Sequence, residues 1–260
     1  MAEEIANKAE QRCKEAVPIC HILNVNIAAV NMGWLIEYTK KNIEQLKGKY
    51  MTVANVHTTV MAYQNEQYRQ VQNGAVLAIP DGGPLSALGR KRGFGEMQRT
   101  TGPDYMKAVF EISAEKGYCH FFYGATEETL KKLKNNLELS YPGLQVAGMY
   151  SPPFRRLTEQ EDAQAVEIIN KARPDFVWVG LGAPKQENWM ADHQGKIDGF
   201  MVGVGAGFDY FAGNIKRAPR WMQKANLEWL YRLCQDPKRL FRRYLITNTQ
   251  FIWYAVIRGK

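Results

Sequence analysis

The sequence lacks features that would assign it at once to several protein classes. It has no run of about 18 uninterrupted apolar residues, the minimum for a membrane-spanning helix. Its four cysteines (Cys13, Cys20, Cys119 and Cys234) are scattered and include no Cys-x-x-Cys pair, so the sequence indicates neither a zinc site nor a disulfide framework. A reducing cytoplasm is therefore the expected compartment.

An Asp-x-Asp pair is missing as well. Enzymes that hold a nucleotide diphosphate through Mg²⁺ or Mn²⁺ need carboxylates as ligands for the metal. Because arginines are abundant here instead, we expect cationic side chains to neutralise a phosphate leaving group, with no metal site and no other cofactor.

Positive charge, in contrast, is plentiful and lies near the C-terminal end. The chain of 260 residues has a net charge of +8, and from Tyr210 onward eleven Lys and Arg residues face only two acidic residues. A near-neutral body with a basic tail indicates an anionic partner: nucleic acid, anionic lipid or a polyphosphate ligand. In this tail, residues 221–257 mix Trp, Tyr and Phe with Lys and Arg, which is typical of a helix at a membrane surface or of a helical hairpin whose cations face water.

The body alternates short apolar runs with amphipathic stretches. Strands are expected at 21–27, 50–55, 75–80, 118–123 and 145–149 and at the starts of 176–187 and 200–209, with helices at 31–47, 57–73, 103–116, 126–138 and 159–172. This order predicts an α/β fold with a Rossmann-like, mostly parallel sheet flanked by helices. We expect a frayed helical extension over residues 1–18, which does not resemble a secretory signal, an α/β catalytic domain over 19–213, and a basic amphipathic appendage over 214–260.

Two glycine-ended strands organise the chain. They read Phe176-Val-Trp-Val-Gly-Leu-Gly-Ala-Pro-Lys-Gln-Glu187 and Phe200-Met-Val-Gly-Val-Gly-Ala-Gly-Phe-Asp209. Glycine at the carboxyl end of a strand lets a ligand approach the backbone and leaves N–H groups free for phosphate oxygens, although ordinary strand-to-helix turns have the same appearance. With the basic tail, the two stretches favour a phosphate-bearing ligand.

A single carboxylate is the candidate general base. Asp81 follows a buried strand and precedes two glycines, so it either reaches into a cleft or forms a simple Pro-Asp-Gly turn. Asn55, His57 and Thr58 end the preceding strand, and neighbouring parallel strands would bring Asn55 beside Asp81. His57 alone fits a helix start or a packing position as well as acid–base work.

Other polar residues have both a functional and a structural interpretation. Asp104 in Gly102-Pro103-Asp104 could bind a hydroxyl or cap a helix. Gln186 could read a uracil edge and Glu187 a ribose diol, or both could be surface residues. Arg232, Arg239 and Arg242 are spaced so that one helical face could present them to a diphosphate, or they could form a solvated basic face.

Nine ordered segments together resemble the WecG/TagA/CpsF glycosyltransferases (family 26), over roughly residues 20–245. They are Ala54-Asn-Val-His-Thr58, Ile79-Pro-Asp-Gly82, Gly102-Pro-Asp104, Phe122-Tyr-Gly-Ala125, Tyr150-Ser-Pro-Pro-Phe154, Gly180-Leu-Gly-Ala-Pro-Lys-Gln-Glu187, Gly203-Val-Gly-Ala-Gly-Phe-Asp209, Arg217-Ala-Pro219 and Leu227-Glu-Trp-Leu-Tyr-Arg-Leu233.

The resemblance implies an inverting, metal-independent transferase. It would move an N-acetylhexosamine, typically N-acetylmannosamine, from a UDP-sugar to a polyprenyl-diphosphate-linked sugar for cell-surface polysaccharide, with the tail docked on the inner face of the cell membrane. Asp81 matches the catalytic base and Asn55 its neighbour in the pocket. The expected substrate-binding residues are His57, Thr58, Gly102, Asp104, Gly124, Tyr150, Ser151, Gly180, Gly182, Lys185, Gln186, Glu187, Gly205, Asp209, Arg232, Arg239 and Arg242.

One departure from the family pattern and two rival functions remain. Some members carry Thr where this chain has Val53, so the sugar specificity can differ, and His57-Thr58 suggests a branch that serves capsule or exopolysaccharide synthesis. A nicotinamide-dependent oxidoreductase would need Gly-x-Gly-x-x-Gly after its first strand, which here ends Ile27-Ala-Ala-Val30. A non-catalytic lipid- or nucleic-acid-binding module would explain the tail but not the polar strand ends. We expect no nucleic-acid partner, and a homo-oligomer is possible.

Overall fold

A computed structural model describes residues 17–259, and residues 1–16 of the extension expected over 1–18 lie outside this range. A six-stranded sheet forms the centre, with every neighbouring pair parallel and the order β4-β3-β8-β7-β5-β6. Its strands are β3 (Tyr50–Ala54), β4 (Leu77–Pro80), β5 (Cys119–Gly124), β6 (Gln145–Tyr150), β7 (Phe176–Gly180) and β8 (Phe200–Gly203). The predicted α/β fold with a mostly parallel sheet is therefore confirmed.

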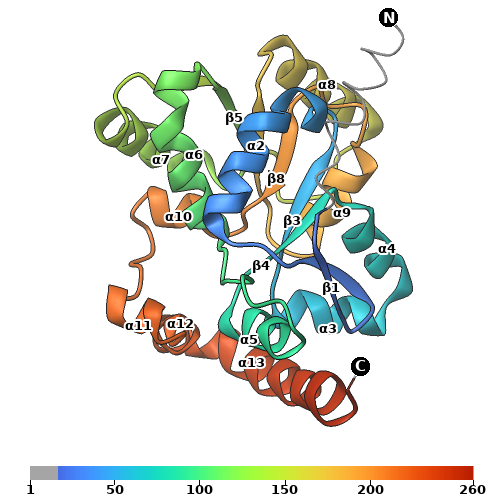
Figure 1. The fold of residues 1–260 in the computed structure, drawn as a ribbon. Helices are drawn as coiled ribbons and strands as arrows, with labels where there is room; N and C mark the ends of the chain where they lie inside the picture. Colours follow the sequence, from blue (N-terminus) through green and yellow to red (C-terminus); the bar gives the residue numbers. More distant parts are fainter. Residues whose placement is uncertain (1–16, 260) are drawn as a thin grey trace, which may run out of the picture.

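Helices cover both faces of the sheet (Figure 1). One layer contains α2 (Met32–Leu46), α6 (Gly102–Lys116) and α7 (Glu127–Ser140), which pack on inward residues such as Phe122 and Trp178. The other contains α8 (Glu159–Lys171) and α9 (Lys185–Asp192), packed on Val177 and Met201. Apart from the outer strand β6, the strands are buried on both sides, which explains why they read as apolar runs and not as alternating patterns.

The segment 21–27, expected as one strand, is instead a hairpin. Strand β1 (Ile19–Ile22) pairs antiparallel with β2 (Val25–Ala28) outside the main sheet. Leu23 and Asn24 form the turn with φ of 50° and 62°. A two-residue turn with both φ positive matches the twist of paired strands, but Leu at the first position gave no sequence signal for it.

The expected helix 57–73 is two helices, α3 (Val56–Gln64) and α4 (Glu66–Gly74), because Asn65 is extended and its side chain caps α4. Helix α5 (Gly83–Lys91) was not predicted. Its glycines weaken a helical pattern, but Pro84 stands in the first turn, where proline is tolerated.

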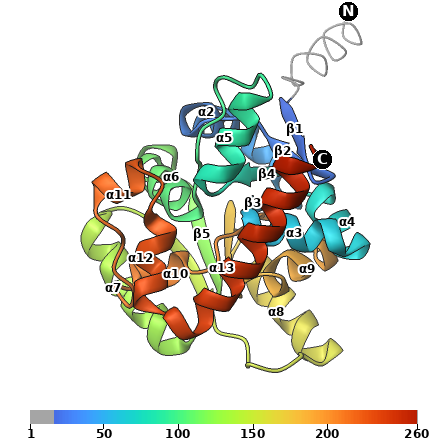
Figure 2. The same ribbon diagram turned by 90° about the horizontal axis from the view of Figure 1, so that it is seen from below.

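After α10 (Gly207–Phe211), the chain forms the C-terminal helices α11 (Arg220–Lys224), α12 (Glu228–Gln235) and α13 (Pro237–Phe251), followed by a π-helical segment at Ile252–Ile257. These helices lie across one end of the sheet, and α13 packs on α3 (Figure 2). Phe251 and Ala255 are buried against the body. The domain boundary at Gly213 stays a prediction.

Candidate functional site

The parallel sheet brings its strand ends to one edge. Ala54 in β3 is in register with Pro80 in β4, and the Asp81 N–H donates to the Ala54 carbonyl over 2.7 Å. Asn55 and Asp81 are therefore neighbours in the backbone, as the strand pattern predicted. The glycine turns follow β7 and β8 at the same edge, where ligands of α/β sheets bind.

Asp81 lies among charged side chains from distant parts of the chain. It is half-buried, and Arg99, Glu228, Arg232 and Asp104 are its electrostatic neighbours. Burial raises the pKa of Asp81 to about 6; Glu228 and Asp104 act in the same direction, whereas Arg99 and Arg232 lower it. A carboxylate with this pKa is a stronger base than an ordinary aspartate and is still mostly ionised at neutral pH.

Beside Asp81 is an ion-pair cluster of Arg99, Asp104, Arg217 and Glu228. Arg99 donates directly to the Glu228 carboxylate. Arg217 binds both oxygens of Asp104 at 2.6 and 2.9 Å, and its Nε lies 3.6 Å from Glu228. Because Glu228 is the first residue of α12 and is buried, the cluster fastens the C-terminal helices to the body next to the base.

Sequence reasoning did not select Arg99, Arg217 or Glu228. Arg217 and Glu228 stand in segments that carry the family resemblance, and this was the only available signal for them. Arg99 lies in a loop between α5 and α6 without any motif, so only the fold brings it to the site.

Asp104 has a structural role in this conformation. Thr101 caps α6 by accepting from the Asp104 N–H at 3.1 Å, and its hydroxyl donates to the Asp104 carboxylate at 2.7 Å. Burial alone would raise the pKa of Asp104, but hydrogen bonds from Arg217 and Thr101 outweigh it and lower the pKa. A Cβ on Gly102 would lie 3.4 Å from Val204, an ordinary contact, so packing alone does not require glycine at the start of α6.

The tail arginines do not share one helical face, so that expectation is wrong. Helix α12 ends at Gln235 and α13 begins at Pro237. Arg232 therefore lies on a different helix from Arg239 and Arg242. Arg232 lies over the Tyr210 ring, 5.8 Å from its centroid, and near Asp81. Arg239 pairs with Asp236 at 2.6 Å with a side chain 64% exposed, and Arg242 is exposed.

Asn55 and Thr58 form a capping box at the start of α3. The Asn55 side chain accepts from the Thr58 N–H at 3.1 Å, and the Thr58 hydroxyl accepts from the Asn55 N–H at 2.9 Å. His57 is half-buried, and its Nδ1 has no hydrogen-bond partner among residues 17–259. Burial and the nearby Arg243 lower the pKa of His57, which favours the neutral imidazole. Substrate contact by these three residues stays a prediction.

The glycine turns are joined by one side chain. Oε1 of Gln186 accepts from the Gly182 N–H at 3.2 Å and from the Gly205 N–H at 3.0 Å. The expectation that the turns leave their N–H groups free for phosphate is therefore wrong at these two positions. Gln186 and Glu187 are buried, so their expected contacts with uracil and ribose would require a change of conformation.

Close packing explains two other selected glycines. A Cβ on Gly124 would lie 2.7 Å from the Gly180 backbone, and a Cβ on Gly180 would lie 2.7 Å from Phe208. Lys185 is exposed at the start of α9, and the Asp209 carboxylate accepts from Asn214 at 3.1 Å. Donor contact by Lys185 and Asp209 stays a prediction.

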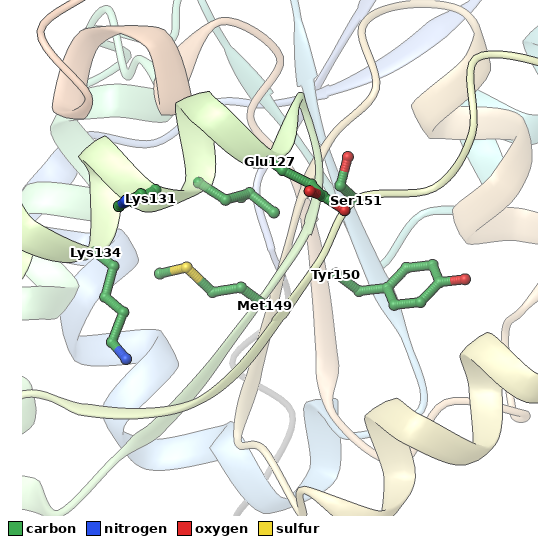
Figure 3. Close-up of a pocket in the computed structure, with 7 residues that line it drawn as sticks. Glu127, Lys131, Lys134, Met149, Tyr150 and Ser151 are labelled. Carbon is green, nitrogen blue, oxygen red and sulfur yellow. The ribbon is translucent and has the colours of Figure 1, made fainter.

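A hollow of about 420 Å³ lies between α7 and the end of β6 (Figure 3). It is lined by Glu127, Leu130, Lys131, Lys134, Met149, Tyr150 and Ser151. Tyr150 stacks on Tyr123, and the Ser151 hydroxyl donates to the Ala125 carbonyl at 2.8 Å. Strands β4 and β6 are the outer strands of the sheet, about 24 Å apart at the usual strand spacing, so the hollow does not adjoin Asp81.

Within residues 17–259, no group of three or more His, Cys, Asp and Glu side chains could hold a metal ion. The same residues include no helix with the length and apolarity to cross a membrane.

One carboxylate of raised pKa, a set of guanidinium groups and two glycine turns thus lie at the carboxyl edge of a parallel sheet. Comparison with known proteins identifies the class as glycosyltransferase. A sequence model of the Glycosyl transferase WecG/TagA/CpsF family matches residues 20–260. The chain belongs to this family.

Two curated relatives cover most of the chain. The N-acetylglucosaminyldiphosphoundecaprenol N-acetyl-beta-D-mannosaminyltransferase of Bacillus subtilis (strain 168) is 30% identical over 220 residues, which are 84% of each chain. The protein of the same name from Staphylococcus aureus (strain MW2) is 28% identical over 242 residues, which are 92% of each chain. The resemblance drawn from the motifs is thereby confirmed.

Proposed function

We propose that this glycosyltransferase moves an N-acetylhexosamine, N-acetylmannosamine or a related sugar, from a UDP-sugar to a polyprenyl-diphosphate-linked sugar, with inversion and without a metal. The main support for this proposal is Asp81, which is half-buried near Arg99 and Arg232. Burial raises its pKa to about 6. The acceptor class is supported by the relatives, whose names specify a diphosphoundecaprenol-linked N-acetylglucosamine.

In the proposed reaction, Asp81 takes the proton of the acceptor hydroxyl. The freed oxygen attacks the anomeric carbon of the donor from the side opposite the nucleotide. The bond between this carbon and the phosphate oxygen breaks, and its electron pair leaves with UDP. Arg232 and the neighbouring guanidinium groups neutralise the developing charge in place of a metal ion.

The test is a panel of radiolabelled UDP-sugars incubated with the full chain and a polyprenyl-diphosphate-linked N-acetylglucosamine. We expect transfer of label from one UDP-N-acetylhexosamine to the lipid, with an inverted anomeric centre and an unchanged rate in EDTA. A strict requirement for Mn²⁺, or transfer only from a donor other than a nucleotide sugar, would contradict the proposal.

We also propose that the C-terminal helices dock on an anionic membrane surface, on the side where the lipid-linked acceptor is presented. They carry most of the large exposed apolar side chains among residues 17–259: Trp221, Trp229, Leu230, Phe241, Leu245, Ile246, Ile252, Trp253, Val256 and Ile257. Lys and Arg residues are interspersed, which suits an interface with anionic lipid headgroups. The inner face of the cell membrane is the proposed location.

Replacing both Phe241 and Leu245 with Ser is expected to reduce sedimentation with phosphatidylglycerol vesicles by about tenfold, because each exposed side chain loses apolar burial in the interface. Both side chains are 60% exposed, so the fold should keep its thermal stability. Leu139→Ser is the control: Leu139 is 81% exposed on α7, outside the C-terminal helices. Equal loss of vesicle binding in the control would contradict membrane docking through α13.

A further inference from the structure

A line of buried polar side chains runs from β3, through α4, to the glycine turns. Helix α4 packs against α9, which begins directly after the first turn (Figure 1). Thr52 in β3 donates to Gln72 at 2.9 Å, and Gln72 donates to the Tyr68 hydroxyl at 2.8 Å. Tyr68 faces the carboxyl group of Glu187 in α9. No step of the proposed reaction uses this line.

Where this line of polar side chains reaches the glycine turns, the orientation of the Gln186 side-chain amide decides whether the turns are hydrogen-bonded. Gln186 can hold the turns after β7 and β8 only if its oxygen faces the N–H groups of Gly182 and Gly205. If the amide were flipped, its NH₂ group would face two N–H donors and both backbone groups would lose their acceptor. The Gly182 and Gly205 N–H groups already favour the oxygen end of the Gln186 amide, and an acceptor on the side of its NH₂ group would strengthen this distinction.

Glu187 is such an acceptor. Its Oε1 accepts from Nε2 of Gln186 at 2.8 Å, and a carboxylate can accept but cannot donate. Glu187 is 1% exposed, so it acts from inside the protein and not from the ligand side. Its other oxygen, Oε2, is buried as well, and the Tyr68 hydroxyl is the polar group of α4 that faces this carboxyl.

We propose that Glu187 is a positioning residue, which fixes the Gln186 amide so that one oxygen holds the two glycine turns in the conformation that receives the nucleotide end of the donor. The inference deepens the proposed function, since the importance of the turns for donor binding rests on it. Glu187 does not touch the donor; it acts through Gln186 and the turns.

The proposal requires a hydrogen-bond acceptor at position 187 but not a negative charge. Glu187→Leu removes the acceptor and is expected to raise the donor KM by about tenfold, with the acceptor KM changed less than about twofold, because the turns lose their fixed geometry. Glu187→Gln keeps a carbonyl oxygen for Gln186 and should stay within about threefold of the wild-type donor KM. Equal losses in both variants would show that charge is required and would overturn the proposal.

A double-mutant cycle tests whether Glu187 acts through Gln186. Gln186→Ala alone should raise the donor KM about as much as Glu187→Leu, and the double variant should lose no more than either single variant. If the double variant's increase in donor KM equalled the product of the two single increases, the two residues would act independently. That result would overturn the inference.

Amide hydrogen exchange measured by NMR without nucleotide separates this inference from the proposed function. In Glu187→Leu, the amides of Gly182 and Gly205 should exchange at least about tenfold faster than in the wild type. The matched control is Asp162→Ala, which removes the 2.9 Å partner of the buried His193 at the other end of α9. It should lower the melting temperature without changing exchange at the turns. Unchanged exchange in Glu187→Leu would overturn the inference, whatever sugar the enzyme transfers.

Discussion

Replacing Asp81 with Asn is expected to lower kcat by about 10²- to 10⁴-fold, the usual contribution of a general base, while UDP binding stays within about threefold. The amide keeps the size of the side chain but cannot take a proton from the acceptor hydroxyl. Turnover is measured with saturating donor and acceptor, and UDP binding by calorimetry. Near-normal turnover in Asp81→Asn would remove Asp81 from the mechanism.

The acid limb of the pH profile and the protein's stability provide controls for this variant. The Asp81 pKa of about 6 lies above the ordinary value of 3.8. Activity should therefore rise from pH 5 to pH 7, as Asp81 loses its proton. Because a raised pKa in the folded state favours the protonated form, Asp81 makes the fold less stable as pH increases from about 4 through 6. Asp81→Asn should accordingly melt no lower than the wild type at pH 7.5, so unfolding would not explain its loss of turnover.

Replacing Arg232 with Ala is expected to reduce kcat/KM for the donor by about 10²-fold, which is typical when one group that stabilises a leaving anion is removed. Arg232 is the tail arginine that lies near Asp81 and over Tyr210. Arg232→Lys keeps the charge but loses the planar pair of donors and should recover only part of the rate. The measurement is steady-state kinetics with varied donor.

Arg239→Ala is the comparison for Arg232→Ala. The family resemblance assigns both arginines to the diphosphate, but Arg239 already pairs with Asp236 and is largely exposed. We expect its loss to cost less than about fivefold, in line with a surface ion pair. Arg232→Ala should also move the acid limb of the pH profile to higher pH, because Arg232 lowers the pKa of Asp81. Equal kinetic losses and no such shift would mean that Arg232 has no special relation to the base.

The sequence predicted the parts of the fold that depend on local pattern. Runs of apolar residues gave the strands of the parallel sheet, and their order placed Asn55 and Asp81 at the ends of neighbouring strands, which the register of β3 and β4 confirms. The hairpin at 19–28 was missed because its turn residues, Leu23 and Asn24, adopt positive φ without glycine.

The parts of the site that the sequence did not predict depend on contacts between distant segments. Arg99 and Glu228 are 129 positions apart, and no periodicity connects them. The helical spacing of Arg232 and Arg239 was misleading, because Pro237 begins a new helix between them. Gln186 has an unremarkable polar appearance in the sequence, and only the convergence of β7 and β8 shows that it links two turns.

Glu228 and Arg232 act on Asp81 in opposite directions, and both belong to α12. Removing α12 from the enzyme would change more than its binding to lipid or nucleotide. Loss of Glu228 would lower the pKa of Asp81 and release Arg99, whereas loss of Arg232 would raise that pKa, so the basicity of the aspartate would no longer be the one set by the intact site. The truncated protein would therefore report the chemistry of an altered catalyst, and its pH optimum could not be transferred to the full-length enzyme.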